Sequence, residues 1–237
     1  GTYANGVLET GEIDSSTTFC SRYFSDDFNL RMVKDINSGS SSSYLDDLTA
    51  FGNTLYFTAS DGTHGNELWK SDGTASGTVM IKDIYSGSSS SSPTYLTVIG
   101  NTFYFRADDG TNGSELWKSD GTASGTVMVK NIRSGLVSSS SPAHFTPIGN
   151  TLYFQANDGT NGSELWKSDG TASGTVMVKN IRSGSGSSYP SKLTAVGNTL
   201  YFQASDGNNG YELWKSDGTA SGTVMVKDIY SGSSSSS

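Results

Sequence analysis

The sequence of 237 residues has one cysteine, two histidines and four prolines, and these low counts exclude several kinds of site. A lone Cys20 can form neither an internal disulfide nor a cysteine-based zinc cluster. Lysine and arginine are also scarce: there are 15, against 23 acidic residues, so the formal charge is −8. This charge disfavours a nucleic-acid partner, because a phosphate backbone needs a basic surface. No apolar run approaches the roughly 18 residues of a membrane-spanning helix, so we expect no membrane insertion.

Glycine and serine fill much of the chain, with 29 glycines, whereas only 33% of residues are apolar and 16% are charged. The length is still sufficient to bury a hydrophobic core without disulfide bonds. The sequence begins at Gly1 rather than at methionine. We therefore expect a mature or trimmed segment, which is compatible with the removal of a signal peptide.

One repeat accounts for the whole chain. The lysine of a [V/I]-K-[D/N]-I motif recurs at spacings of 48, 48, 49 and 48 residues, at Lys34, Lys82, Lys130, Lys179 and Lys227. The motif Glu-Leu-Trp-Lys-Ser-Asp-Gly-Thr occurs four times in register with it. A fixed period of this length indicates a repeat architecture. The predicted units are 1–43, which is degenerate, and 44–92, 93–141, 142–189 and 190–237.

Each unit is predicted to contain four short strands. Asn-Gly and Asp-Gly steps, typical of tight hairpins, separate runs that are rich in β-branched and aromatic residues. No window has a capped helical period of 3.6 residues. In the last unit the expected strands are 192–196, 199–204, 211–215 and 223–229.

A four-stranded meander repeated at this interval is typical of a propeller blade, because stacking covers both faces of each blade. We therefore predict an all-β fold, a single five-bladed β-propeller over residues 1–237. A linear β-solenoid is the competing architecture. The serine-rich runs recur between successive units, which favours ordered or half-ordered crossover loops over flexible spacers. Their composition also suits O-glycosylation.

The repeated residues resemble a known family. The run Asn-Thr-Leu-Tyr-Phe, then Asp-Gly-x-x-Gly-x-Glu-Leu-Trp-Lys-Ser-Asp-Gly-Thr, then Val-Lys-Asp-Ile, is similar to the ELWxxDGT repeat of bacterial secreted and cell-surface proteins. The match covers residues 44–237 well and residues 1–43 weakly. This resemblance implies export to the cell exterior and a multi-repeat, propeller-like protein. The five-bladed layout also resembles the tachylectin-2-type propeller lectins, in size and arrangement only.

The pattern gives no support to an enzyme. The two histidines, His64 and His144, occupy different positions in their units, so no catalytic residue is predicted. The tryptophans lie in an apolar alternation and are expected to pack in the core rather than stack on sugars. They are Trp69, Trp117, Trp166 and Trp214.

Two sets of residues are candidates for ligand contact. A glutamate two residues before each tryptophan either hydrogen-bonds a neighbouring turn or faces a ligand; these are Glu67, Glu115, Glu164 and Glu212. Loop positions that differ between units are the second set, because binding diversifies through loops on a fixed scaffold. Neutral drift explains the same differences, and strand-interior positions are expected to change little. The chosen loop candidates are Tyr85, Arg133, Arg182, Tyr230 and Tyr211.

The Asp-Gly turns are weak candidates for calcium, with Asp61, Asp109, Asp158 and Asp206 as ligands. Calcium takes about six to eight oxygens, more than one such turn supplies, and a hairpin needs Asp-Gly in any case. No other cofactor or metal is expected.

These observations favour an extracellular, non-enzymatic, lectin-like propeller that binds glycans or other surface polymers. Several weak, equivalent sites would act together on a multivalent partner. The alternative is a structural or adhesive cell-surface or filament module without a small-molecule ligand. Self-association, or membership of a longer repeat array, is compatible with both.

Overall fold

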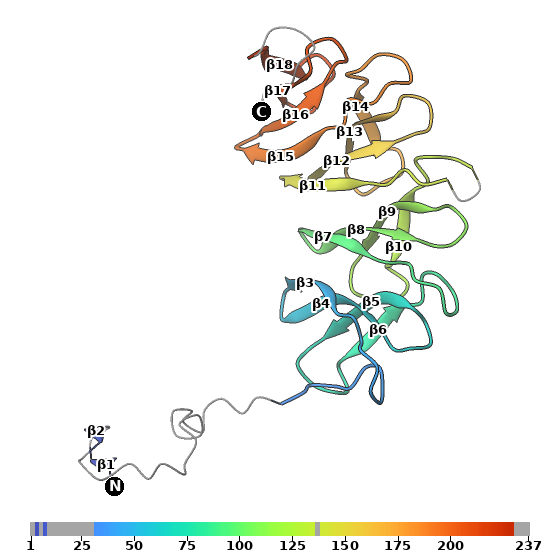
Figure 1. The fold of residues 1–237 in the computed structure, drawn as a ribbon, viewed down its shortest axis with the longest axis vertical. Helices are drawn as coiled ribbons and strands as arrows, with labels where there is room; N and C mark the ends of the chain where they lie inside the picture. The colour runs from blue at the N-terminus through green and yellow to red at the C-terminus, as the bar shows by residue number, and fades with distance from the viewer. Residues whose placement is uncertain (1–2, 5–6, 9–30, 136–137, 230–237) are drawn as a thin grey trace. The chain divides into compact units, whose positions relative to one another are not determined.

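The computed structural model describes residues 3–4, 7–8, 31–135 and 138–229, and the elements found there are strands (Figure 1). The chain divides into two compact units, residues 1–32 and 33–237. In the first, β1 (Tyr3–Ala4) pairs antiparallel with β2 (Val7–Leu8). None of the described residues belongs to a helix long and apolar enough to cross a membrane.

The second unit contains four antiparallel sheets of four strands each, paired in sequence order. The first sheet is β3 (Asp46–Phe51), β4 (Thr54–Ser60), β5 (Asn66–Ser71) and β6 (Val79–Lys82). The second is β7 (Thr94–Ile99), β8 (Thr102–Asp108), β9 (Ser114–Ser119) and β10 (Val127–Lys130). The third is β11 (Ala143–Ile148), β12 (Thr151–Asn157), β13 (Ser163–Ser168) and β14 (Val176–Lys179). The fourth is β15 (Ser191–Val196), β16 (Thr199–Ser205), β17 (Tyr211–Ser216) and β18 (Val224–Lys227).

The predicted all-β fold with four strands per unit is therefore confirmed for these four units. The last strand is shorter than expected and ends at Lys227 rather than at residue 229. It ends there because the Ile229 amide donates to the Glu212 side chain at 3.2 Å and thus leaves the ladder to β17.

The Lys-Ser-Asp-Gly-Thr segment forms the turn between the third and fourth strands of each sheet. In the second sheet, Oδ1 of Asp120 accepts hydrogen bonds from the Thr122 amide at 2.9 Å and from the Thr122 hydroxyl at 2.7 Å. Gly121 has a φ of +88°, which a residue with a side chain rarely adopts. The turn is thus closed by its own residues, in agreement with the Asp-Gly signal.

The core lies between successive sheets. At the first boundary, Tyr56, Leu68 and Ile81 of the first sheet pack against Phe105 and Trp117 of the second. The same positions form the second and third boundaries. The four tryptophans are buried, so the expectation that they pack in the core is confirmed. Each sheet is therefore stabilised mainly by its neighbours, as in other repeat proteins.

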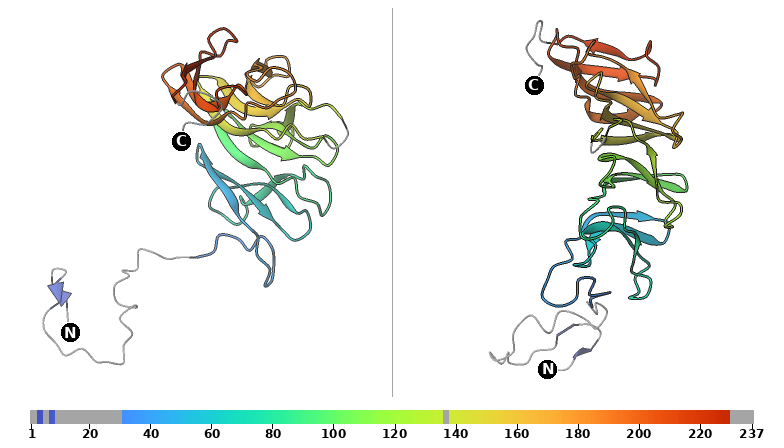
Figure 2. Two further views of the ribbon diagram at one scale, coloured as in Figure 1. Left: turned by 45° about the horizontal axis from the view of Figure 1, so that its top comes forward. Right: turned by 90° about the vertical axis from the view of Figure 1, so that its right-hand side faces the viewer.

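Within the second unit, the first strands of neighbouring sheets contact one another: β3 contacts β7, β7 contacts β11, and β11 contacts β15. Two further views show these sheets following one another in chain order (Figure 2). The arrangement is a propeller-like repeat architecture with four complete blades among the described residues. The expected fifth blade falls largely on residues 9–30, outside the described residues.

Candidate ligand-binding site

The glutamates before the tryptophans hold each crossover to its sheet. Oε2 of Glu115 accepts hydrogen bonds from the Ile132 amide at 2.9 Å and the Ser140 hydroxyl at 2.6 Å, and Oε1 accepts from the Ser140 amide at 3.0 Å. Glu67 and Glu164 make the same three contacts. All three side chains are fully buried at 0% exposure, out of reach of a dissolved ligand.

Burial raises the pKa of these three glutamates, although hydrogen bonds from serine hydroxyl and backbone amide groups act to lower it. Glu212 is also buried, and its Oε2 accepts from the Ile229 amide. Of the two roles that the sequence left open, the geometry supports the structural one. The crossover serines that they bind, Ser91, Ser140 and Ser188, are buried as well, so the crossovers are ordered at these residues.

The variable residue after the Lys-Asp/Asn-Ile motif follows the fourth strand of its sheet. Its side chain reaches the Asp-Gly turn between the second and third strands of the next sheet. A Cβ placed on Gly110 would clash with the Tyr85 ring, and one on Gly159 would lie 3.2 Å from Arg133 Nε. A Cβ placed on Gly207 would likewise lie 2.9 Å from Arg182 Nε. These side chains therefore cover glycines across sheet boundaries, whatever else they contact.

Two further loop candidates have different positions. Tyr211 is the first residue of β17 and pairs with Ser205 of β16. Tyr230 lies outside the described residues. The four loop candidates that the structure describes therefore do not gather into one cluster around a common point.

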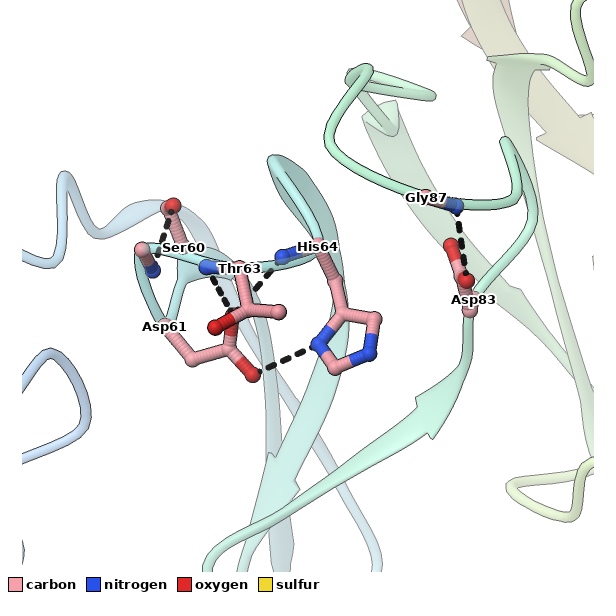
Figure 3. Close-up of polar contacts among 7 residues, drawn as sticks. Ser60, Asp61, Thr63, His64, Asp83 and Gly87 are labelled. Carbon is pink, nitrogen blue, oxygen red and sulfur yellow. Dashed lines mark hydrogen bonds and ion pairs between the residues drawn. The ribbon is translucent and has the colours of Figure 1, made fainter.

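The calcium candidates use their carboxylates within their own turns. Oδ1 of Asp61 accepts from the Thr63 and His64 amides at 2.8 and 2.9 Å, and Oδ2 contacts His64 Nδ1 at 2.8 Å (Figure 3). Asn112, Asn161 and Asn209 take the place of His64 beside Asp109, Asp158 and Asp206. Burial acts to raise the pKa of all four aspartates, but these hydrogen bonds outweigh it and lower the pKa. Over the described ranges, no three His, Cys, Asp or Glu residues gather as metal ligands.

The feature that sequence reasoning missed is a bulge in the first strand of each sheet. The residues at the bulge have positive φ angles although none is glycine: 50°, 63°, 60° and 54° at Asp47, Tyr95, His144 and Lys192. The strand pairing shifts register at the same place in all four sheets. Bulges of this kind redirect a side chain, and backbone strain is concentrated at functional sites.

The first strands also differ most between units: they read DDLTAF, TYLTVI, AHFTPI and SKLTAV. The expectation that strand interiors change little is therefore wrong for this strand. The reason is positional, because first strands pack less of their surface into the sheet boundaries than second and third strands do. Repeat comparison alone would have found these differences, had the first strand been compared position by position.

The bulges of the second and third sheets meet where Tyr95 contacts Phe145, the residue after the bulge residue His144. The Tyr95 ring is centred 5.6 Å from the Phe145 ring of the next sheet, and the Arg106 guanidinium lies 5.1 Å from the Tyr95 ring centre. Burial, and then the charge of Asp46, raise the pKa of Asp47, whereas the Tyr95 amide and Arg106 act to lower it. The candidate binding site is the line along which the first strands β3, β7, β11 and β15 contact one another. It combines aromatic, acidic and basic side chains.

Comparison with known proteins supports the fold. No protein-family model and no curated protein matches the sequence. Among solved structures, a prolyl endopeptidase is similar with a TM-score of 0.50 and 15% identity, over 77% of this chain and 26% of that one. A puromycin hydrolase has a TM-score of 0.48 and 15% identity, over 74% and 27%. A TolB-like protein of Agrobacterium tumefaciens has a TM-score of 0.42 and 12% identity, over 77% and 64%.

The chain thus spans only about a quarter of the length of the two hydrolases. At these identities the likeness concerns the propeller-like fold alone. It is no argument for or against catalysis by this chain.

Proposed function

We propose that the protein is a non-enzymatic, lectin-like, five-bladed propeller of the ELWxxDGT-repeat type, which binds glycans outside the cell. Two contacts of the degenerate first repeat, residues 1–43, support a fifth blade. Lys34 Nζ donates to the Thr78 carbonyl at 2.7 Å, as Lys82 donates to Thr126 at 2.8 Å. Ile36 packs on the first sheet where later units use an isoleucine in the same way.

The observation that carries the proposal is the variation at the first-strand bulges within a frame that is otherwise copied. Tyr95 and His144 supply flat rings, and Asp47 and Lys192 supply hydrogen-bonding groups. Sugars are recognised by this combination, since a ring covers their apolar face while polar groups bind their hydroxyls. Sites that are weak singly bind strongly when several engage one polymer.

A glycan array tests the proposal, with micromolar protein in calcium and again in EDTA. Selective binding of one terminal sugar is expected, and Tyr95→Ala should weaken it while leaving the fold intact by circular dichroism. Loss of binding in EDTA would assign a role to the Asp-Gly turns. No binding to a broad array in either buffer would overturn the proposal.

A second candidate is a structural or adhesive module that stacks end to end. It is favoured by the face of the fourth sheet that points away from the third, where Leu213, Val226 and Ile229 are exposed. Equivalent side chains are buried by the next sheet at the three inner boundaries. Sedimentation over a hundredfold range of concentration tests it: assembly that Leu213→Lys abolishes supports stacking, and a monomer at all concentrations contradicts it.

A further inference from the structure

A cavity of about 410 Å³ lies at the boundary between the first and second sheets, next to the first-strand bulge. Residues from β3, β4 and β5 line one side, and the crossover into β7 lines the other. Its volume is in the lower part of the range for small-molecule sites. The lining residues that matter below are Tyr44, Asp46, Thr58, Asn66, Pro93 and Thr94.

A short side chain in β4 distinguishes this boundary from the others. Thr58 pairs with Asp46, and its hydroxyl donates to the Pro93 carbonyl at 2.9 Å, so it is held against the crossover. The sister sheets have a longer side chain at this position, namely Arg106, Gln155 and Gln203. A threonine here leaves space that an arginine or a glutamine would occupy.

Two polar atoms at this cavity are buried without a hydrogen-bond partner within the described part of the chain. They are Oδ1 of Asn66 and Oγ1 of Thr94. Within the described residues, Nε1 of each buried tryptophan is unpaired too, so it is the place of Asn66 and Thr94 in the lining of this cavity that sets them apart. A buried polar atom left unpaired is costly, and a ligand that hydrogen-bonds to it removes that cost. Asn66 and Thr94 are also particular to this boundary, because Ser114 and Ala143 stand at the corresponding positions of the next one.

The chemistry of the lining selects a class of ligand. An amide oxygen, a hydroxyl and the exposed Asp46 carboxylate offer mainly hydrogen-bond acceptors, which suit hydroxyl donors and repel anions. Tyr44 and Pro93 add an apolar surface. A ring that carries hydroxyl groups and one apolar face matches both parts.

We propose that this cavity is a binding site for one neutral, polyhydroxylated sugar ring, with Asn66, Thr94 and Asp46 accepting its hydroxyl groups. The site rests on the proposed glycan-binding function. It gives the boundary between the first and second sheets a higher affinity for sugar than the other boundaries have. It also predicts that the four sheets, although similar, do not bind equally.

Saturation-transfer NMR on the full chain tests this, with free galactose, mannose, glucose, N-acetylglucosamine and N-acetylgalactosamine as probes. Thr58→Gln places a sister residue in the cavity and is expected to weaken binding of the recognised sugar at least about tenfold. Asn66→Ser, another sister residue, should weaken it several-fold. Gln155→Thr, the reverse change in the third sheet, should leave it unchanged. Melting curves show that each variant is folded.

The outcomes separate the two proposals. Binding by the wild type that Thr58→Gln and Asn66→Ser leave unchanged would overturn the cavity site while the lectin function stands. Equal losses in Gln155→Thr and Thr58→Gln would also overturn it, because the effect would then not be local. No binding of any probe by the wild type, together with a silent array, would overturn both proposals.

Discussion

Leu165 and Leu213 occupy the same position in the third strands of successive sheets, yet Leu165 is 0% exposed and Leu213 is 40% exposed. The contrast extends across the face. Val178 and Ile181 are 6% and 7% exposed, whereas Val226 and Ile229 are 46% and 62% exposed. The sequences of the two sheets are nearly the same here, so the difference comes from the neighbour. One sheet follows the third, and among the described residues none follows the fourth.

Local hydrogen bonds do not follow this contrast. The Ser168 and Thr175 hydroxyls lie 2.7 Å apart, and so do those of Ser216 and Thr223 in the last sheet. The turn between them is closed in the same way in both. The hydrogen bonds of the turn thus form within a single sheet, whereas the burial of these apolar side chains depends on the presence of the next sheet.

The largest expected effect is on the buried leucine. Leu165→Ala should lower the free energy of unfolding by about 3 kcal/mol, because it leaves a cavity in a packed boundary. Leu213→Ala should cost about 1 kcal/mol or less, since the side chain is already partly in water. Urea unfolding of the two variants measures the difference. Equal losses would mean that the outer face of the fourth sheet is covered in solution.

A pair of glycines sharpens the same comparison in the turns. Gly170 has a φ of +86°, and a Cβ there would clash with the Tyr104 hydroxyl of the preceding sheet. Gly73, with a φ of +88°, has no atom within 4 Å of that position among the described residues. Gly170→Ala should therefore cost about 3 kcal/mol through strain and clash, and Gly73→Ala about 1 kcal/mol through strain alone. Thermal unfolding compares them; similar costs would show that the first sheet is also packed there.

Much of this architecture could be predicted because its signals are local. The Asp-Gly and Asn-Gly turns and the alternation of apolar residues mark each strand, and the buried tryptophans follow from that alternation. The role of Glu115 needed the fold, since its partner Ser140 is 25 residues away. The nearly constant separation of each glutamate from a crossover serine, 24 or 25 residues, was the available clue.

The first-strand bulge lacks the usual signal. Positive φ angles normally occur at glycine or asparagine, but here they occur at Tyr95 and His144. The recurring local feature is a threonine two residues later, whose hydroxyl donates to the carbonyl of the positive-φ residue in all four sheets, at 2.9 Å from Thr97 to Tyr95. The cavity beside Thr58 was hidden for a different reason, because it depends on what two sheets leave between them.

The buried glutamates predict a pH dependence that arises at the boundaries. Because burial raises the pKa of Glu164 above its value in the unfolded chain, its contribution to stability is complete below the ordinary pKa, near 4.3, and is lost as the pH rises through the folded pKa. Glu164→Gln should flatten this decline between pH 4 and pH 7, because a glutamine side chain does not titrate. Urea midpoints across that range measure it.

Glu164→Gln also weakens the hydrogen bonds to Ile181 and Ser188, so its stability at any single pH is not informative. The slope with pH is the diagnostic quantity. Glu115→Gln, at the preceding boundary, should change the slope by a similar amount. Slopes equal to that of the wild type in both variants would contradict burial as the cause.

The smallest expected difference is between two lysines at the same position. Lys167 Nζ donates to the Gly218 carbonyl of the next sheet at 2.9 Å, whereas Lys215 Nζ has no hydrogen bond to any residue in the described ranges. Lys167→Met should cost about 1 kcal/mol, the net value of a hydrogen bond, and Lys215→Met less than about 0.5 kcal/mol. Methionine keeps the apolar stem, so the pair isolates the contribution of the ammonium group. If an intact repeat were supplied to the outer face and packed there as the fourth sheet packs on the third, Lys215→Met should become as costly as Lys167→Met, because the lysine would then have the same carbonyl to bind.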